Sequence, residues 1–376
     1  MALENILMND FSRQWLDIGA DCLTAVERVG QSGWYVLGRE VSAFETQLAG
    51  FCGVKHAVAC ANGLDAIEIA LRAMELRQGE KVLTTPLSAF ATSLAIHRAG
   101  GEPVFVDVDQ TGNLDLDEAE KALAADRSIR FMVPVHLFGH ALDLDRLEAL
   151  RDRFGLRVVE DAAQAIGASF KGRPIGSVGR AATLSFYPTK NLGALGDGGA
   201  LLTNDDELAK RFLNLRDYGQ SAKYVHDVLG MNSRLDELHA AVLAQAMLPR
   251  LATWLQRRVE VAARYVAGLK NERVAVVTPL EGASSAWHLF PLRVLSGQRE
   301  ALIGHLKAHN IQCGIHYPMI IPDQTALSHI PQFRNEGILS LARSFASDEI
   351  SLPIHPFLSD AEVDRVILAV NSWSAL

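Results

Sequence analysis

Short apolar runs alternate with helical patterns through the first two thirds of the chain. A strand is predicted where β-branched and other apolar residues form a short run between turn-forming residues. The runs that meet this description are HAVACA (56–61), KVLTTP (81–86), PVFVDVD (103–109), IRFMVPVHL (129–137), LRVVED (156–161), AATLSFYP (181–188) and GALLTN (199–204).

Most of these runs are separated by stretches whose apolar residues are spaced by three and four. Residues 64–74 place Ile67, Leu71 and Met74 on one helical face, and 142–154 has a similar pattern. Apolar strands that alternate with helices predict an α/β fold with a mostly parallel sheet covered on both faces. In such sheets the ligand crevice lies beyond the carboxyl ends of the strands, so polar residues there are the first candidates for a site.

The pattern changes at Ser233. Ser233 and Asp236 have capping-box spacing before a long amphipathic run, 235–248, and Pro249 is predicted to end or kink that helix. We therefore expect a large domain over 1–249 and a smaller α+β domain over 250–376. The smaller domain is predicted to contain strands VAVVTP (274–279), HLFPLRV (288–294) and ISLPIHP (350–356), and helices over 298–310 and 359–373.

The charge balance narrows the possible partners. The 376 residues include 36 Lys and Arg against 44 Asp and Glu, a net charge of −8, so a surface that follows a nucleic acid is not expected. No run of apolar residues is long enough for a membrane span, and no secretion signal is evident, so a cytoplasmic location is expected. The four cysteines form no CxxC pair, so no metal or dithiol site is expected.

Chemistry-bearing residues follow several predicted strands. Asp161 ends LRVVED, Lys190 follows AATLSFYP in a glycine-rich segment, and Asn62-Gly63-Leu64 joins HAVACA to a helix. Each feature alone has an ordinary explanation: a helix cap, a solvated lysine and a tight turn. The GDGG segment (196–199) is not a dinucleotide fingerprint, because it precedes a strand and opens no helix.

Together these residues fit pyridoxal 5′-phosphate (PLP). This cofactor needs an amine for a Schiff base, which Lys190 can supply if its pKa is lowered. It also needs a carboxylate facing the pyridine nitrogen, for which Asp161 is the candidate. Its phosphate needs backbone N–H groups at a helix N-terminus and a hydroxyl, here the Gly63–Leu64 junction and Ser185.

Five segments resemble one family. They are NGLDAIEIAL (62–71), the run from VVEDAAQ to ALLTND (158–205), RDYG (216–219), GMNSRLDELHAA (230–241) and HYP (316–318). Their order and spacing, over nearly the whole chain, resemble the DegT/DnrJ/EryC1/StrS sugar-nucleotide aminotransferases. The resemblance implies the type I, aspartate-aminotransferase-like PLP fold and a homodimer with active sites at the subunit interface.

The resemblance also implies a role for individual residues. Lys190 is similar to the lysine that binds the cofactor and moves the proton, and Asp161 to the partner of the pyridine nitrogen. The other cofactor contacts that it implies are Gln164 at the 3′-oxygen, Gly63, Leu64 and Ser185 at the phosphate, Asn232 from the other subunit and Phe90 stacked on the ring. Three of these have structural alternatives: Phe90 as core, Gln164 as a helix cap and Asn232 as a turn residue.

The substrate assignment follows from the same resemblance. Relatives that dehydrate carry His where this chain has Lys190, so transamination is favoured, with glutamate giving 2-oxoglutarate. The segments GWYVLG (33–38) and NGLDA (62–66) resemble the branch that aminates C3 of dTDP-3-keto-6-deoxyhexoses. The sugar-pocket candidates are Tyr187, Tyr224, His316 and Tyr317, although His316-Tyr317 also suits a packed turn before Pro318.

Three other functions stay open at this point. A C4 aminotransferase acting on a nucleotide-linked 4-keto sugar differs from the leading prediction only in regiochemistry. A PLP-binding regulatory protein without turnover is a second alternative, although no DNA-binding motif or basic tail supports it. A NAD-dependent sugar epimerase or dehydrogenase would need a glycine-rich fingerprint after the first strand, and the sequence has none there.

Overall fold

The computed structural model describes residues 4–295, 297–327 and 339–374. All seven predicted strands form one sheet, in the order β1-β9-β8-β5-β4-β2-β3. β9 is antiparallel to both of its neighbours, and every other pair is parallel, so the mostly parallel α/β sheet is confirmed. The strand bounds are β1 (His56–Cys60), β2 (Lys81–Thr84), β3 (Glu102–Phe105), β4 (Phe131–Val133), β5 (Arg157–Asp161), β8 (Ala181–Ser185) and β9 (Gly199–Thr203).

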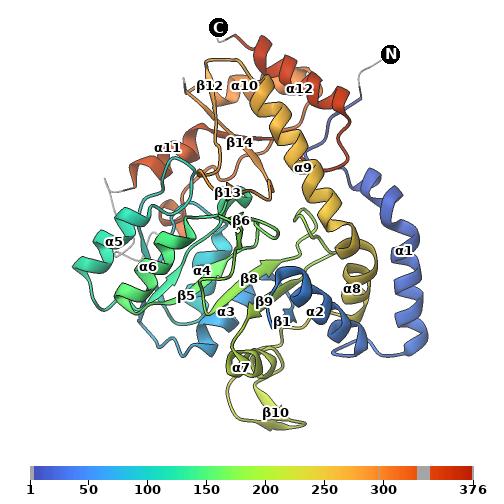
Figure 1. Cartoon of the computed structure of the whole chain (residues 1–376), viewed down its shortest axis with the longest axis vertical. Coiled ribbons are helices and arrows are strands. Elements are labelled where there is room, and N and C mark those ends of the chain that lie inside the picture. The colour runs from blue at the N-terminus through green and yellow to red at the C-terminus, as the bar shows by residue number, and fades with distance from the viewer. Residues whose placement is uncertain (1–3, 296, 328–338, 375–376) are drawn as a thin grey trace.

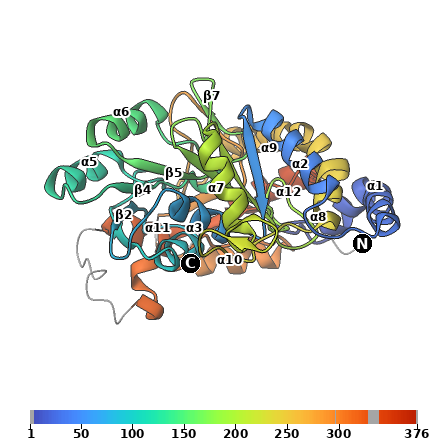
Figure 2. The same ribbon diagram turned by 90° about the horizontal axis from the view of Figure 1, so that it is seen from below.

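Helices cover both faces of this sheet, as predicted (Figures 1 and 2). Alternate strand residues enter two separate apolar clusters, for example Val58 in one and Ala59 in the other. The Val58 cluster takes side chains from α3 (Gly63–Ala73), α4 (Phe90–Arg98) and α7 (Asp206–Arg216). The Ala59 cluster takes them from α1 (Phe11–Ser32), α2 (Arg39–Cys52), α5 (Leu116–Ala125) and α6 (Leu144–Phe154).

The predicted capping box at Ser233 is wrong. α8 (Glu237–Val242) begins at Glu237, and the side chain of its N-cap residue, Asp236, makes no capping hydrogen bond. The Ser233 hydroxyl instead accepts from the N–H of Ala61 at 3.2 Å, next to the end of β1. The Glu237 carboxylate accepts three backbone N–H bonds at the start of α2, so it caps the N-terminus of that helix from a distant part of the chain.

Pro249 does not end the helical run. A π-helical turn (Leu243–Met247) follows α8 and leads directly into α9 (Leu248–Gly268), where Pro249 lies in the first turn. Pro249 has no backbone N–H to donate to the preceding turn, and the wider π-helical turn directly before it lets the helical run continue past the proline. The division into domains at residue 249 stays a prediction.

The C-terminal part has the predicted α+β character. Its antiparallel sheet has the order β12 (Val274–Val276), β14 (Phe290–Val294), β15 (Glu349–Leu352). α10 (Arg299–Ala308), α11 (Ser340–Asp348) and α12 (Asp360–Ser372) accompany it, and Ser359 with Glu362 forms a capping box for α12. This part lies at the opposite end of the molecule from the hairpin β10 (Gln220–Ala222)–β11 (Val225–His226) (Figure 1).

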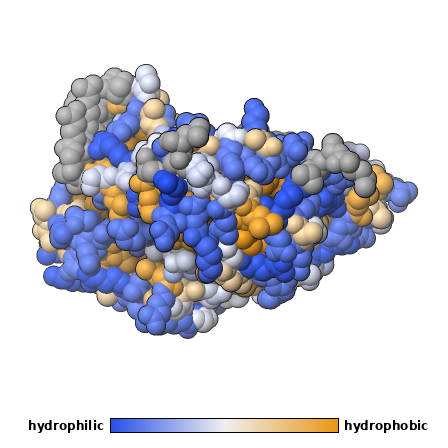
Figure 3. Space-filling view, turned by 90° about the horizontal axis from the view of Figure 1, so that it is seen from above, coloured by the Kyte–Doolittle hydropathy of each residue, from blue (hydrophilic) through white to orange (hydrophobic). Residues whose placement is uncertain are grey.

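The surface mixes hydrophilic and hydrophobic residues, the latter in several separate patches on the face shown in Figure 3. A third small sheet joins β6 (Ser169–Phe170), β7 (Arg173–Pro174) and β13 (Ala283–Ser284). Within the described ranges, no helix has the length and apolar character needed to cross a membrane.

Candidate active site

A cavity of about 460 Å³ lies where the sheet rule predicts it, at the carboxyl ends of β5 and β8 and the start of α3. Its volume is large enough for a small organic cofactor, since such sites have volumes of roughly 300–1,000 Å³. Seven of the predicted site residues line it: Gly63, Leu64, Asp161, Gln164, Ser185, Tyr187 and Lys190.

Asp161 is the last residue of β5 and is buried, with 4% of its surface exposed. Its Oδ2 accepts from the Thr92 hydroxyl at 2.8 Å, and its Oδ1 accepts from the Ala163 N–H at 3.1 Å. Burial raises the pKa of Asp161, while these two hydrogen bonds and the charge of Lys190 act in the opposite direction. A cation facing the carboxyl group in the cavity would favour its ionised form further.

Lys190 lies in the loop after β8, where its backbone N–H donates to the Tyr187 carbonyl at 2.8 Å. Burial lowers the pKa of Lys190 to about 8, and the charge of Asp161 opposes that shift. At pH 7 about a tenth of such amines are neutral, compared with fewer than a thousandth for an ordinary lysine. The side chain can therefore act as a nucleophilic amine at neutral pH, as the sequence analysis required.

The start of α3 lines the same cavity and could hold an anion. The Asn62 side chain caps the helix by accepting from the Asp65 N–H at 2.8 Å. The preceding N–H groups, of Gly63 and Leu64, have no carbonyl partner within the helix, and the helix dipole places positive potential there. A Cβ on Gly63 would lie 2.8 Å from the Ser185 Cβ, so only glycine lets the Ser185 hydroxyl approach this end of the helix.

These groups fit PLP in their chemistry. A buried carboxyl, an amine of lowered pKa, and a helix N-terminus with an adjacent hydroxyl line one cavity. They match, in the same order, the needs of the pyridine nitrogen, the aldehyde carbon and the phosphate. Asp161, Lys190, Gly63, Leu64 and Ser185 are the residues that would hold the cofactor.

Gln164 links the cavity to the HYP segment. Its Oε1 accepts from the Phe138 N–H at 2.6 Å, and its Nε2 donates to the Tyr317 hydroxyl at 3.1 Å. Gln164 lies in a turn, so the alternative that it caps a helix does not hold. Tyr317 thus lies one hydrogen bond from the cavity, and the Lys190 charge contributes to the lowered pKa of the neighbouring His316.

Five predicted site residues do not line the cavity of this chain. Two of them are Tyr317, which bonds Gln164, and His316, which precedes it; the other three are Phe90, Asn232 and Tyr224. Phe90 is half-buried and packs against an apolar cluster that includes Leu87 and Phe105, while Ser88 and Ala89 line the cavity. The other two are exposed: Asn232 forms a backbone bridge with Asp217, and Tyr224 lies at the tip of the β10–β11 hairpin. Their cofactor and substrate roles stay predictions.

Thr92 is a site residue that the sequence analysis did not identify. It lies four residues after Ser88, whose hydroxyl is 3.1 Å from its own, and both are buried at the start of α4. The family resemblance points to Phe90 in the segment SAFAT (88–92), and the hydroxyl two positions later is the one that reaches Asp161. The spacing of two hydroxyls by one helical turn was the available signal.

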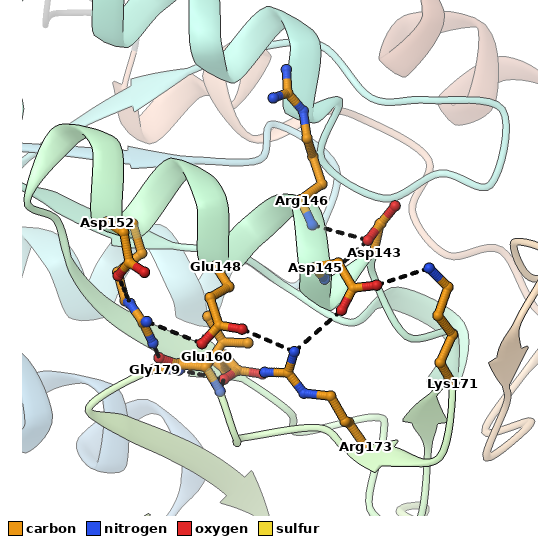
Figure 4. Close-up of polar contacts among 11 residues, drawn as sticks. Asp143, Asp145, Arg146, Glu148, Asp152, Glu160, Lys171, Arg173 and Gly179 are labelled. Carbon is orange, nitrogen blue, oxygen red and sulfur yellow. Dashed lines mark hydrogen bonds and ion pairs between the residues drawn. The ribbon is translucent and has the colours of Figure 1, made fainter.

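Glu160, which precedes Asp161 on β5, is a second residue that the sequence patterns did not indicate; Figure 4 shows its carboxylate beside Gly179. It is fully buried, and its carboxylate accepts from the N–H groups of Gly176, Val178 and Gly179 and pairs with His136 at 2.9 Å. Burial alone would raise the pKa of Glu160, but the bonds from His136 and the backbone lower it. The pair fixes the end of β5 against the loop after β7, and so fixes the direction of Asp161.

Comparison with known proteins decides the family. The model of the DegT/DnrJ/EryC1/StrS aminotransferase family matches residues 16–371. The chain belongs to this family. The predicted family and the assignment as an aminotransferase are thereby confirmed.

Several curated relatives align with nearly the whole chain. The dTDP-3-amino-3,4,6-trideoxy-alpha-D-glucose transaminase of Streptomyces venezuelae is 40% identical over 367 residues, 97% of this chain and 95% of that one. The dTDP-3-amino-3,6-dideoxy-alpha-D-galactopyranose transaminase of Aneurinibacillus thermoaerophilus is 43% identical, covering 93% and 94%. A pleiotropic regulatory protein of Geobacillus stearothermophilus is 39% identical, covering 96% and 97%.

Solved structures confirm the type I PLP fold. The crystal structure of S. venezuelae DesV in complex with a ketimine intermediate has a TM-score of 0.94 and 40% identity, covering 99% of each chain. The structure of NtdA from Bacillus subtilis with bound cofactor PMP has a TM-score of 0.90 and 28% identity, covering 98% of this chain and 85% of that one. The fold described above is therefore that of a PLP-dependent aminotransferase.

Proposed function

We propose that the protein transfers an amino group from glutamate to C3 of a dTDP-3-keto-6-deoxyhexose, with PLP held in the cavity. The observation that carries this function is the placement of Lys190, Asp161 and the N-terminus of α3 on one cavity. Bound PLP supplies an electron sink and a carrier for the amino group. The chain's own residues supply the binding, orientation and proton transfer.

Lys190 moves the proton. Its lowered pKa lets the amine exist in both protonation states near neutral pH, so it can accept a proton at one carbon and deliver it at another. Asp161 would hold a negative charge for the pyridine nitrogen, and the bonds from Thr92 and the Ala163 N–H favour its ionised form. Gly63, Leu64 and Ser185 hold the phosphate and fix the position of the ring.

Two curated relatives support the choice of C3. Both are named for an amino group at position 3 of a dTDP-linked deoxysugar, and each is at least 40% identical over more than nine tenths of this chain. Amination of a 4-keto sugar is the second candidate. A panel of 3-keto and 4-keto dTDP-sugars, each incubated with the PLP-loaded protein and glutamate, distinguishes them by product identification. Amination of the 4-keto sugar with the 3-keto sugar unchanged would refute the C3 proposal.

One relative is named as a regulatory protein, so turnover itself needs a test. We expect the purified protein to show visible absorbance from bound PLP, which glutamate converts and which Lys190→Ala abolishes. A protein that binds PLP but leaves glutamate and every keto sugar unchanged would be a PLP-binding regulator. A colourless protein that PLP cannot reconstitute would refute both functions.

We also propose that the protein is a homodimer with shared active sites. Asn232 and Tyr224 are exposed and lie away from the chain's own cavity, as side chains that serve a partner's cavity would. Lys190→Ala and Asn232→Ala variants tested alone are expected to be impaired. When the two are unfolded and refolded together, mixed dimers regain one intact site, so activity rises above that of either variant. Activity that stays at the mean of the two variants would place Asn232 in its own chain's site or outside any site.

A further inference from the structure

A buried polar chain on the C-terminal sheet connects to the site. His316 Nδ1 lies 2.9 Å from Ser351 Oγ, and Ser351 Oγ lies 2.5 Å from Glu349 Oε1. The His316 backbone N–H donates to the other carboxyl oxygen, Glu349 Oε2, at 2.6 Å. Glu349 and Ser351 are two residues apart on β15, so their side chains share one face, and neither is exposed to solvent.

With a neutral imidazole ring, the chemistry of these groups allows two arrangements of hydrogens. Oε2 of Glu349 always accepts, because a backbone N–H can only donate. When Glu349 is ionised, Ser351 donates to Oε1 and accepts from Nδ1–H of His316, which leaves His316 Nε2 as an acceptor. When Oε1 carries a proton, both bonds reverse: Ser351 donates to Nδ1, and Nε2–H becomes a donor.

The environment keeps the ring neutral and places the titrating proton on the carboxyl group. Burial lowers the pKa of His316 to about 4, and the charge of Lys190 adds to this. Burial raises the pKa of Glu349 to about 8, against the hydrogen bonds from His316 and Ser351 and the charge of Arg299. The other ionisable groups close by are Cys313 and Tyr317 near Glu349, and His288 near His316; burial raises the pKa of the thiol and the phenol and lowers the pKa of the His288 imidazole, so each favours its neutral form.

The imidazole is held in place. Gly314 exchanges backbone hydrogen bonds with Ser351 at 3.0 and 2.8 Å, and a Cβ on Gly314 would lie 2.7 Å from the His316 Cε1. The imidazole ring therefore packs against the Gly314 backbone. The ring of the next residue, Tyr317, lies edge-on to it, with 5.6 Å between the ring centroids. Among the described residues Nε2 of His316 has no hydrogen-bond partner, so this nitrogen is available to a ligand.

We propose that Glu349 and Ser351 are positioning residues that set the tautomer of His316, making Nε2 an acceptor when Glu349 is ionised and a donor when it is protonated. A proton that arrives at Nε2 displaces the Nδ1 proton to Ser351 Oγ, and the Ser351 proton passes to Glu349 Oε1. One proton is thereby stored on Glu349 while the ring stays neutral. The inference rests on the proposed function only for the identity of the group that meets Nε2, a hydroxyl or amine of the substrate.

The tautomer can be read directly by NMR. The PLP-loaded, [15N]histidine-labelled protein is titrated across pH 6–10, with long-range 1H–15N correlations assigned to His316 through a His316→Gln variant. We expect Nδ1 to be the protonated nitrogen above about pH 8 and Nε2 below it, with no imidazolium pattern in between. One unchanging tautomer, or an imidazolium at neutral pH, would overturn the proposal.

Two variants distinguish proton transfer from His316 through Ser351 to Glu349 from hydrogen bonds that only stabilise the fold. Glu349→Gln keeps the bond to the His316 N–H and turns its amide N–H₂ toward Ser351, so the Nε2–H form is expected at every pH. Ser351→Ala breaks the connection, so the pH-dependent exchange of tautomers is lost. Glu300→Gln, which removes an exposed carboxylate beside Arg299, is the matched control and keeps the wild-type midpoint.

A pH-dependent exchange that persists in Glu349→Gln would contradict the proposal even if that variant folds less well. These spectra need neither glutamate nor a keto sugar, so a protein without transaminase activity still gives a readable answer. The same variants then separate substrate handling from cofactor handling. We expect an altered KM for the keto sugar and an unchanged visible spectrum of bound PLP.

Discussion

The Thr92 hydroxyl donates a 2.8 Å hydrogen bond to Oδ2 of Asp161 beneath the cavity. Both side chains are buried, at 1% and 4% exposure, so water does not compete for this bond. It joins the start of α4 to the end of β5, two elements far apart in the sequence. Because the carboxylate is the better acceptor, the bond favours the ionised form of Asp161 against the effect of burial.

Thr92→Val is therefore expected to reduce catalysis without a large change in shape. A hydrogen bond to a charged group contributes about 1.5–3 kcal/mol, which corresponds to a loss of roughly tenfold to a hundredfold in kcat/KM. Steady-state kinetics with glutamate measures it. Thr46→Val is the control, since the Thr46 hydroxyl bonds only a carbonyl within its own helix, at an exposed position. Equal kcat/KM values for the two variants would show that Thr92 does not support Asp161.

Lys190→Met is expected to stabilise the cofactor-free protein at neutral pH. The folded pKa of Lys190, about 8, lies below the ordinary 10.5, so the buried ammonium opposes folding by up to about 3 kcal/mol. This cost is fully present below about pH 8 and disappears as the pH rises through 10.5. Urea unfolding should give the variant a higher free energy of unfolding than the parent protein at pH 7. This difference should be smaller at pH 10.

Lys210→Met serves as the control for that comparison, because Lys210 is 67% exposed and pairs with Glu207 at the surface. Its stability change should be small and should not depend on pH in this way. A Lys190→Met protein that is less stable than the parent at pH 7 would mean that packing, rather than desolvation of the amine, dominates at this position.

The central sheet could be predicted because its strands carry strong local signals. Each is a short, mainly apolar run between turn residues, and burial on both faces makes the apolar run continuous, as in GALLT (199–203) of β9. The capping box expected before the helix at Glu237 was wrong because the Ser233 hydroxyl is used in a distant contact and no side chain caps this helix. Ser233 bonds Ala61, and no local pattern records a partner so distant in the sequence.

Some residues of the candidate site could likewise be predicted from the sequence, and others could not. Lys190, Asp161 and Gly63 follow strands directly, so the sheet rule brings them together from sequence alone. Thr92 reaches Asp161, and Glu160 reaches the loop after β7, through tertiary packing that no sequence period encodes. The exposed Asn232 shows a further limit, since its predicted role depends on a second subunit.

Glu160→Gln is expected to destabilise the fold strongly. An amide cannot accept three backbone N–H bonds and a histidine N–H in place of a carboxylate, and breaking such a buried pair costs about 3–5 kcal/mol. Because the pKa of Glu160 is lowered in the folded state, its contribution is present above about pH 4.5 and is lost as the pH falls below it. In thermal unfolding, the difference in Tm between the parent protein and Glu160→Gln should be constant from pH 6 to 8. Glu207→Gln, at an exposed position, should change stability by less than about 1 kcal/mol; a similar small effect for Glu160→Gln would remove it as an anchor of Asp161.

Gly63→Ala tests the phosphate end of the cavity. The added Cβ would lie 2.8 Å from the Ser185 Cβ, so either the start of α3 or the Ser185 hydroxyl must move away from the anion site. We expect PLP to bind at least about tenfold more weakly, a change of ~1.4 kcal/mol, measured by absorbance titration of the cofactor-free protein. Gly50→Ala in α2 is the matched control, because a Cβ there has no neighbour within 4 Å. Retention of wild-type PLP affinity in Gly63→Ala would mean that the phosphate is held elsewhere, and Gly63, Leu64 and Ser185 would no longer be candidates for its contacts.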